Sequence, residues 1–484
     1  MTTRIPETGL DRETVFAALE QARAKDLAWR KGRAYAYVYD GGKEIEEVGK
    51  HAYMAFLTEN GLDPTVFPSL LQFENDLAAM ARTHLGGDEH VVGNFTSGGT
   101  ESIMLAVKAA RDHFRELHPE VAGKPELVLP ITAHAAFFKA AHYLDVTAVP
   151  VPVNPETFRA DPAQMRAAIT ERTMMLVASA SSYAHGVVDP VREIAALAAE
   201  RGLLCHVDGC IGGFLLPYFR RLGAEVPDFD FRVPGVTSMS MDFHKYALCP
   251  KGASIVLYRD KALRRHQIYA CSSWTGYTMV NNTIQSSKSG GPMAAAWAVL
   301  QFVGDAGYLR IAKDLLATQR ALVAGIRAIP GLRVLGEPEM TLVAFASDEL
   351  SVFQLCDAMK KRGWYIQPQL AYGSSPANVH LSIQPSNVQW TEALLKDLRA
   401  AVEELRGRPQ PDLAPMAQAL TAQIEADPSG QAMANIVAMT RGSGDGPTPD
   451  EMADTNHLLD ALPRPLQERL LVEYVNEMFV PSSR

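Results

Sequence analysis

Residues 236–258 read VTSMSMDFHKYALCPKGASIVLY and place a lysine, Lys245, between two apolar runs that are typical of buried strands. Lysine is almost never fully buried unless it is paired, so this position needs an explanation. A lysine amine in a dry site after a strand can form an imine with a carbonyl compound, provided that its pKa is lowered. The alternative is an ordinary lysine in a surface loop, and the dipeptide His244-Lys245 alone does not separate the two interpretations.

Strand-like runs alternate with helical segments on both sides of this stretch. Such an alternation indicates an α/β domain with a largely parallel central sheet. Strands are expected at 127–131, 146–153, 174–178, 203–207, 236–239 and 253–257. Apolar periodicity predicts helices at 13–26, 67–87 and 293–328.

The pattern changes after the long helix at 293–328. Strands are expected within 332–347 and 379–385, and a strongly amphipathic helix at 390–407, which together predict a smaller α+β domain. A segment rich in glycine and proline, 441–452, then leads into a helical tail. The expected organisation is an N-terminal arm (1–60), a large cofactor-binding domain (61–310), a small domain (311–408) and a linker with a helical tail (409–484).

Composition excludes several classes of function. The chain has 484 residues and a formal net charge of −9, which disfavours a nucleic-acid-binding surface. Five scattered cysteines without a CxxC pair predict no disulfide framework and favour a cytoplasmic location. No apolar run approaches 18 residues and the first residues lack a signal-peptide pattern, so we expect no membrane-spanning segment. No metal site is predicted.

Asp208 supports a cofactor at Lys245. It ends the strand in LLCHVDGCIGG (203–213), and α/β sheets bind ligands at the carboxyl ends of their parallel strands. Pyridoxal 5'-phosphate (PLP) needs a carboxylate at its ring nitrogen, because protonation there makes the ring an effective electron sink. An aspartate that only caps the next helix is the alternative interpretation.

Two further motifs fit the same cofactor. TSGGTES (96–102) opens a helix, and its glycines let backbone N–H groups approach a phosphate. No Gly-Lys-Ser/Thr follows, so this is not a Walker A loop. His134, in ITAHAAFFKAA (131–141), follows a strand and can stack on an aromatic ring. A generic capped turn and a structural histidine are the alternatives.

Six blocks of sequence together resemble the sphingosine-1-phosphate lyases, which belong to the PLP-dependent group II decarboxylases. The resemblance, to the soluble bacterial type, runs from about residue 35 to 405. It implies the aspartate aminotransferase fold (fold type I), PLP as cofactor and a homodimer with shared active sites. The blocks are TSGGTESIMLAVKAARD, AHAAFFKAA, HGVVDPV, HVDGCIGGFLLP, FDFRVPGVTSMSMDFHKYALCPKGASIVLYRD and SGGPMAAAWAVL.

The resemblance implies a role for each matching residue. Lys245 would bind the cofactor covalently, Asp208 would pair with the ring nitrogen and His134 would stack on the ring. Tyr39 and Lys251 would serve the substrate, with Tyr39 also catalytic. The cofactor phosphate would be held by Gly98, Gly99, Thr100, His244 and, from the facing subunit, Ser287.

Two substrate positions depart from the family pattern. Asp63 stands where the family has a histidine for the substrate phosphate, and an anion there would repel a phosphate. Lys288 replaces an arginine, which keeps the charge but loses the bidentate fork.

The implied reaction is a retro-aldol cleavage of sphingosine 1-phosphate or a related β-hydroxy amine to an aldehyde and (phospho)ethanolamine. An amino-acid decarboxylase on the same fold is the alternative, and Asp63 favours it. A non-catalytic scaffold would not need Lys245, Asp208 and His134 together.

Overall fold

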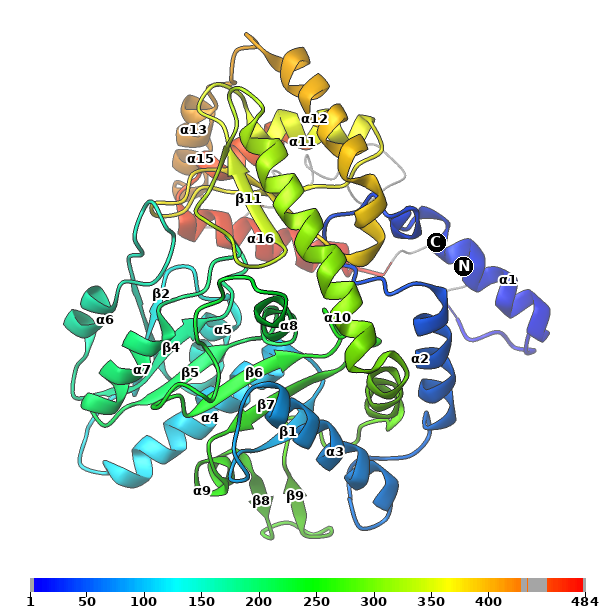
Figure 1. Ribbon diagram of the computed structural model, residues 1–484, viewed down its shortest axis with the longest axis vertical. Helices are drawn as coiled ribbons and strands as arrows, with labels where there is room; N and C mark the ends of the chain where they lie inside the picture. Colours follow the sequence, from blue (N-terminus) through cyan, green and yellow to red (C-terminus); the bar gives the residue numbers. More distant parts are fainter. Residues whose placement is uncertain (1–3, 428–432, 434–450, 482–484) are drawn as a thin grey trace.

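A seven-stranded sheet forms the centre of the computed structural model, which describes residues 4–427, 433 and 451–481 (Figure 1). Its neighbouring strands are parallel except for one, β7, which runs antiparallel to both of its neighbours. In spatial order the strands are β1 (Val92–Thr96), β7 (Ser254–Tyr258), β6 (Ser238–Asp242), β5 (Leu204–Asp208), β4 (Thr173–Ser179), β2 (Glu126–Pro130) and β3 (Thr147–Val151).

Alternate residues of the central strands pack against helices on opposite faces of the sheet. In β2, Leu127 and Leu129 join the apolar cluster of α4 (Gly99–Leu117) and α5 (Ala136–Leu144). The intervening Val128 joins the cluster of α6 (Pro162–Ala168) and α7 (Val191–Glu200). Because both faces are covered, these strands read as continuous apolar runs. The prediction of an α/β domain with a mainly parallel sheet is confirmed.

The six strands predicted in the large domain are present, with ends that differ by one to three residues. A seventh strand, β1, was not predicted: its last residue, Thr96, was expected to open the glycine-containing turn before a helix. Gly93 and Asn94 obscure the apolar pattern of this strand. Gly93 is needed because a Cβ atom would lie 2.5 Å from the carbonyl oxygen of Val256 in β7.

The smaller sheet has four antiparallel strands, in the order β10 (Arg333–Val334), β11 (Leu342–Ala346), β13 (Asn378–Ser382) and β12 (Gln367–Gln369). It carries α11 (Val352–Lys361) and α12 (Thr391–Leu405), which confirms a smaller α+β unit. The predicted long helix is α10 (Gly291–Arg327), broken at Gly304, and it contacts β10 and β11 of the smaller sheet as well as α3 and α8 of the large domain (Figure 1). The expected boundary between residues 310 and 311 lies within this helix.

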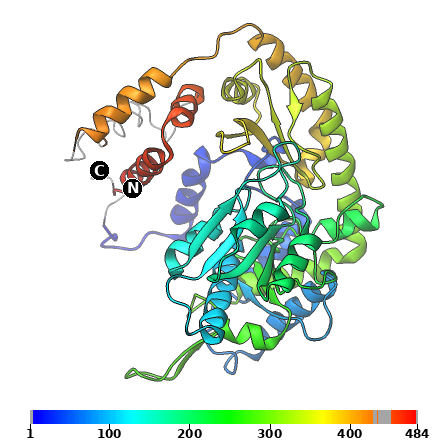
Figure 2. The ribbon, with the colours of Figure 1, turned by 90° about the vertical axis from the view of Figure 1, so that its left-hand side faces the viewer.

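Peripheral elements surround this body (Figures 1 and 2). Helix α1 (Arg12–Ala22), then a 3-10 turn, accounts for the predicted helix 13–26, and α3 (Pro68–His84) for 67–87. The hairpin β8 (Tyr269–Cys271) and β9 (Met279–Asn281) projects away from the body in both views. The remaining helices are α2 (Lys43–Ala55), α8 (Leu216–Arg221), α9 (Lys261–Arg264), α13 (Ala414–Glu425), α15 (Ala453–Ala461) and α16 (Arg464–Met478).

The C-terminal helices follow a segment that is only partly described. Most of the predicted breaker-rich linker 441–452 lies outside the described residues. Within residues 4–427, 433 and 451–481, no helix combines the length and apolar character needed to cross a membrane.

Gly186 tests how the two sheets fit together. Its φ is +70°, and an added Cβ would collide with the carbonyl oxygen of Leu342 in β11. We expect Gly186→Ala to lower the free energy of unfolding by about 2 kcal/mol more than Gly202→Ala does. Gly202 is the matched control, because its φ is +68° and its Cβ would meet nothing within 4 Å. Equal urea midpoints for the two variants would contradict this packing.

Candidate active site

Lys245 forms a buried ion pair at the carboxyl end of β6. Its Nζ lies 2.8 Å from Oδ2 of Asp242, the last residue of the strand. Asp242 is almost fully buried, and its Oδ1 makes no hydrogen bond within the described chain. The lysine is therefore paired, as a buried lysine must be.

The ion pair changes the expected protonation of Lys245. Burial lowers the pKa of the Lys245 ammonium, but the charge and hydrogen bond of Asp242, together with Cys210 and Tyr39, raise it by more, so the net pKa lies above its ordinary value. The expectation that a dry site lowers the pKa of Lys245 is therefore wrong for the protein without cofactor. Burial also raises the pKa of the Asp242 carboxyl, but the charge of Lys245, the neighbouring His244 and hydrogen bonds to the carboxylate together more than reverse that effect.

Asp208 lies on the neighbouring strand, at the end of β5 and opposite Ser240 of β6. Its Oδ1 accepts hydrogen bonds from the Cys210 N–H at 3.0 Å and the Ser240 hydroxyl at 3.3 Å. Burial raises the pKa of the Cys210 thiol, and Asp208 and Asp242 raise it further. Asp208 and Asp242 therefore both act on one buried side chain.

The glycine turn before α4 reaches the same place. A Cβ on Gly99 would lie 2.7 Å from Cys210 Sγ and 3.0 Å from both carboxylate oxygens of Asp242. A Cβ on Gly98 would lie 3.6 Å from Cε1 of His244. The start of a 19-residue helix, with its free N–H groups and positive dipole end, thus faces His244 and the Lys245–Asp242 pair. Thr100, one residue further, is exposed.

His244 has defined partners for both ring nitrogens. Its Nδ1 accepts a hydrogen bond from the Ala253 N–H at 3.2 Å, so the proton of the neutral ring lies on Nε2. Nε2 lies 3.5 Å from Oδ2 of Asp242. Burial lowers the pKa of His244 despite the Asp242 charge, and neighbouring lysines lower it further. The ring is therefore held neutral and correctly oriented.

Tyr39 and Lys251 form a second pair beside Lys245. The Nζ of Lys251 lies 4.8 Å from the Tyr39 ring centroid, and the Tyr39 ring packs edge-on against Tyr246. Burial and the charge of Lys245 lower the pKa of Lys251 to about 8. Burial raises the pKa of Tyr39, which Lys245 partly offsets. The tyrosine therefore carries its proton near neutral pH, and a minority of Lys251 is present there as the neutral amine.

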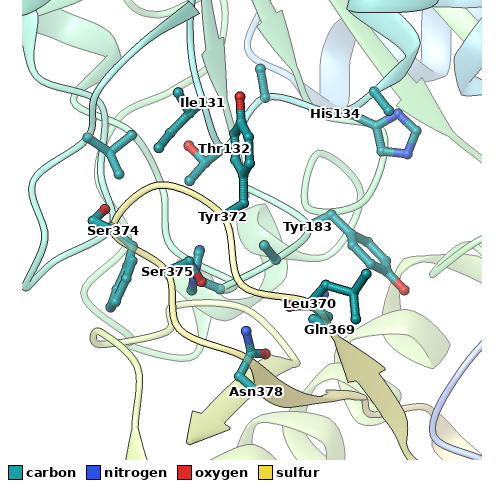
Figure 3. Close-up of a pocket in the computed structure, with 16 residues that line it drawn as sticks. Ile131, Thr132, His134, Tyr183, Gln369, Leu370, Tyr372, Ser374, Ser375 and Asn378 are labelled. Atoms are coloured by element: carbon teal, nitrogen blue, oxygen red, sulfur yellow. The ribbon is translucent and has the colours of Figure 1, made fainter. Parts of the chain in front are cut away.

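His134 lines a cavity of about 300 Å³ between the two sheets (Figure 3). The residue is exposed, and its Nδ1 accepts a hydrogen bond from the Ala136 N–H at 3.1 Å. Figure 3 shows the rings of His134 and Tyr183 on one side of the cavity, pointing away from Ser374. Lys245 lowers the pKa of Tyr183 against the larger raising effect of burial, which places that hydroxyl near the lysine. None of the lining side chains is Asp, Glu, Lys or Arg.

Asp63, Ser287 and Lys288 belong to a separate cluster. Gly61 donates to the Lys288 carbonyl oxygen at 2.8 Å, and Asn60 bridges to Ser289, so the two segments lie side by side. The exposed Asp63 carboxylate accepts from the N–H and the hydroxyl of Thr65. Within the described residues, no hydrogen bond or ion pair joins this cluster to Lys245.

The family model of the pyridoxal-dependent decarboxylase conserved domain matches residues 57–348, more than half of the chain. This chain belongs to the pyridoxal-dependent decarboxylase family. Members of the family use PLP, so PLP is the cofactor and the chain is a PLP-dependent lyase. The fold is that of the PLP-dependent enzymes of fold type I, as predicted.

Relatives in this decarboxylase family include enzymes of both predicted reactions. The sphingosine-1-phosphate lyase of Arabidopsis thaliana is 39% identical over 84% of this chain and 75% of its own length. The L-aspartate decarboxylase of Thermococcus kodakarensis is 31% identical over 83% of this chain and all of its own length. The solved sphingosine-1-phosphate lyase of Burkholderia pseudomallei superposes with a TM-score of 0.81, at 34% identity, over 88% of this chain and 97% of that one.

The residues around Lys245 fit the pyridoxal cofactor of the family. Gly98 and Gly99 leave room for close approach at a helix N-terminus, which suits a phosphate. The Asp208 carboxylate, fixed by two donors, suits a protonated ring nitrogen. Asp242 keeps one buried oxygen without a partner. Lys245 is the amine that lies among these groups.

A second family model, described as a C-terminal putative HTH domain of pyridoxal-dependent enzymes, matches residues 411–477 of this chain. This segment carries eleven acidic residues, three arginines and no lysine. Such a charge disfavours contact with a nucleic-acid backbone. Within the described residues, helices α13, α15 and α16 of this segment pack around one apolar cluster.

Asp242 is the site residue of this pyridoxal enzyme that sequence reasoning missed. It stands at the start of the stretch DFHKY, but no role was predicted for it. A useful signal was available: a carboxylate in a buried strand, three residues before a lysine, needs a cationic partner. Tyr183, by contrast, lies in no sequence pattern that points to the site.

Asp242→Asn tests the electrostatic role of this carboxylate. Asp242 favours the protonated form of Lys245, so its neutralisation should lower the lysine pKa. The free amine then appears at lower pH, and the pH of half-maximal PLP attachment to the apoenzyme should fall by about one unit or more. Asp230→Asn, which changes a different buried carboxylate, serves as the control. An unchanged pH profile in Asp242→Asn would disprove this role.

Proposed function

We propose that this enzyme is a carbon–carbon lyase that cleaves sphingosine 1-phosphate or a related β-hydroxy amine to an aldehyde and (phospho)ethanolamine. Bound PLP supplies a sink for the electron pair left on Cα when one of its bonds breaks. The protein must remove the proton of the β-hydroxyl group as the Cα–Cβ bond opens. It must also return a proton to Cα.

The Tyr39–Lys251 pair is the observation that carries this proposal. A retro-aldol reaction needs a group that accepts a proton from a hydroxyl, whereas decarboxylation does not. Lys251, with a pKa lowered to about 8, has an appreciable neutral fraction near physiological pH. Its Nζ lies over the Tyr39 ring, and both side chains feel the charge of Lys245.

We assign the remaining roles on the same geometry. Lys245 would hold the cofactor and, when its amine is free, would move a proton together with His244, which the Ala253 N–H orients. Asp208 would pair with the ring nitrogen, and His134 would contact the ring. Gly98, Gly99 and Thr100 hold the phosphate at the start of α4.

Lys245→Ala should abolish aldehyde release and the visible absorbance of the bound cofactor, while the circular dichroism of the fold is retained. The amine is the group that attaches the cofactor, and its loss leaves only Asp242 unpaired. The assay supplies a long-chain β-hydroxy amine with and without phosphate and measures both aldehyde and CO₂. Turnover by Lys245→Ala would refute the role of Lys245, and CO₂ without aldehyde from an amino acid would refute the lyase.

An amino-acid decarboxylase is the second candidate. It is favoured by the L-aspartate decarboxylase relative and by the anionic Asp63. An α-carboxylate needs a cation or strong donors, and the cavity beside His134 has no cationic side chain in its lining. For this reason we place the decarboxylase second.

A phosphate on the substrate would have to bind near Asp63 and Lys288. Asp63 would repel a phosphate. Its carboxylate is, however, held by the turn to Thr65, which also lowers the pKa of Asp63. Lys288 lies in the segment beside it and donates to the Thr283 hydroxyl at 3.3 Å. We propose that these residues serve the substrate end of a site shared between subunits.

Asp63→His should improve the use of phosphorylated over unphosphorylated amines by about tenfold, because it exchanges a repulsive charge for a donor. The measurement is the ratio of kcat/KM for one β-hydroxy amine with and without its phosphate. Asp63→Asn removes the charge without adding a cation and separates the two contributions. An unchanged ratio in both variants would exclude Asp63 from the substrate site.

We also propose a homodimer and a cytoplasmic location. Helix α1 buries none of its residues within the chain and exposes Val15, Phe16 and Leu19, as an arm that packs on a second subunit would. Ser287 is exposed, as a residue that completes a facing site must be. All five cysteines are free, which suits a reducing compartment.

A further inference from the structure

The C-terminal helices hold one loop of the cavity beside His134. Residues 370–375 connect β12 to the segment before β13, and four of them line the cavity: Leu370, Tyr372, Ser374 and Ser375 (Figure 3). Most of the remaining wall comes from the loops after β2, β3 and β4, including Ile131, Phe158 and Tyr183, and the strands β12 and β13 contribute Gln369 and Asn378. The position of this loop therefore sets the width of a cavity that shares His134 with the cofactor site.

The backbone N–H and the backbone carbonyl of Ala371 are both hydrogen-bonded to charged side chains of the C-terminal helices. The Ala371 N–H donates to Oδ1 of Asp460, at the end of α15, at 2.7 Å. The Ala371 carbonyl oxygen accepts a hydrogen bond from the guanidinium of Arg464, at the start of α16. The same guanidinium lies 5.6 Å from the Tyr372 ring centroid. Hydrogen bonds to charged groups are about twice as strong as neutral ones.

These two side chains are themselves fixed. Arg464 donates to Oε1 of Gln467 at 2.8 Å, and the Gln467 amide donates to the Leu459 carbonyl oxygen at 2.6 Å. Helix α15 is anchored in turn on α11, where the Asp357 carboxylate accepts from the N–H groups of Met452 and Ala453. The loop is thus tied through α15 and α16 to the small sheet.

The loop has few fixed contacts of its own on the cavity side. Tyr372 and Ser375 exchange two backbone hydrogen bonds, of 2.9 and 3.0 Å, which form a tight turn. The Ser375 hydroxyl lies 3.0 Å from Nε2 of His185, whose pKa burial lowers to about 4, so this ring is neutral. A loop of this kind depends on the charged contacts at Ala371 for its position.

We propose that Asp460 and Arg464 are positioning residues that hold loop 370–375 as the wall of a substrate subsite, which takes the uncharged aliphatic part of the amine substrate. The subsite is lined by apolar side chains such as Ile131, Phe158 and Leu370 and by no charged group. It adjoins His134, so a chain extending from Cβ of a cofactor-bound amine would enter it. The assignment of an aliphatic group to this subsite rests on the proposed lyase function. The contact between loop 370–375 and the C-terminal helices does not depend on that function.

The test compares Asp460→Asn/Arg464→Gln with the matched control Glu468→Gln/Arg469→Gln, which changes two exposed side chains of α16. Each holoenzyme is assayed with two β-hydroxy amines that differ only in chain length. We expect the test variant to lose about tenfold in the ratio of kcat/KM for the long over the short amine, mostly through KM. Hydrogen exchange should quicken at residues 370–375 and not in the large sheet, while the visible cofactor absorbance is unchanged. The control should match wild type.

Three results would overturn the proposal. The first is an unchanged rate of hydrogen exchange at residues 370–375. The second is an equal loss of kcat/KM for the long and the short amine. The third is hydrogen exchange that quickens throughout the molecule. If the double variant does not fold, Asp460→Asn alone is measured in the same way. Failure of the lyase function itself would be seen in the wild-type enzyme, as absence of aldehyde, and the exchange comparison would still decide the role of Asp460 and Arg464.

Discussion

The buried ion pair between Lys245 and Asp242 is the interaction on which the site depends. A lone ammonium or a lone carboxylate would be costly at this depth, and removal of either partner leaves the other uncompensated. The pair is placed by β6, which ends at Asp242, and is flanked by Asp208 at the end of β5 and by the glycine turn before α4.

The structure separates this cluster of charged side chains from the cavity beside His134, which has no Asp, Glu, Lys or Arg in its lining. On one side lie Lys245, Asp242, Lys251 and His244, whose pKa values are shifted first by burial and then by one another's charges. On the other side, beyond His134, the cavity wall is apolar and neutral. A substrate with a reactive polar head and a long apolar tail matches this division, whereas a small dicarboxylate does not.

The sequence predicted the fold where local pattern and final environment agree. Five of the six predicted strands of the large sheet, all except the edge strand β3, are buried along nearly their whole length, which favours the apolar runs by which strands are recognised. Strand β1 was missed, because Gly93 serves a close approach to β7 that only the folded sheet creates. Lys245, Asp208 and His134 could be predicted as candidates because each follows or ends a strand. The protonation of Lys245 could not, because it depends on a contact with Asp242 in three dimensions.

The connection between β6 and β7 is short and carries both Lys245 and Lys251. Strand β7 runs antiparallel to β6 and is held on its other side by β1, so each end of this connection is fixed by a hydrogen-bonded strand. A change in its length by a single residue would move the two amines relative to each other and to Asp242. Divergence of specificity on this scaffold is therefore expected to proceed by substitutions in the surrounding loops, while insertions and deletions accumulate elsewhere.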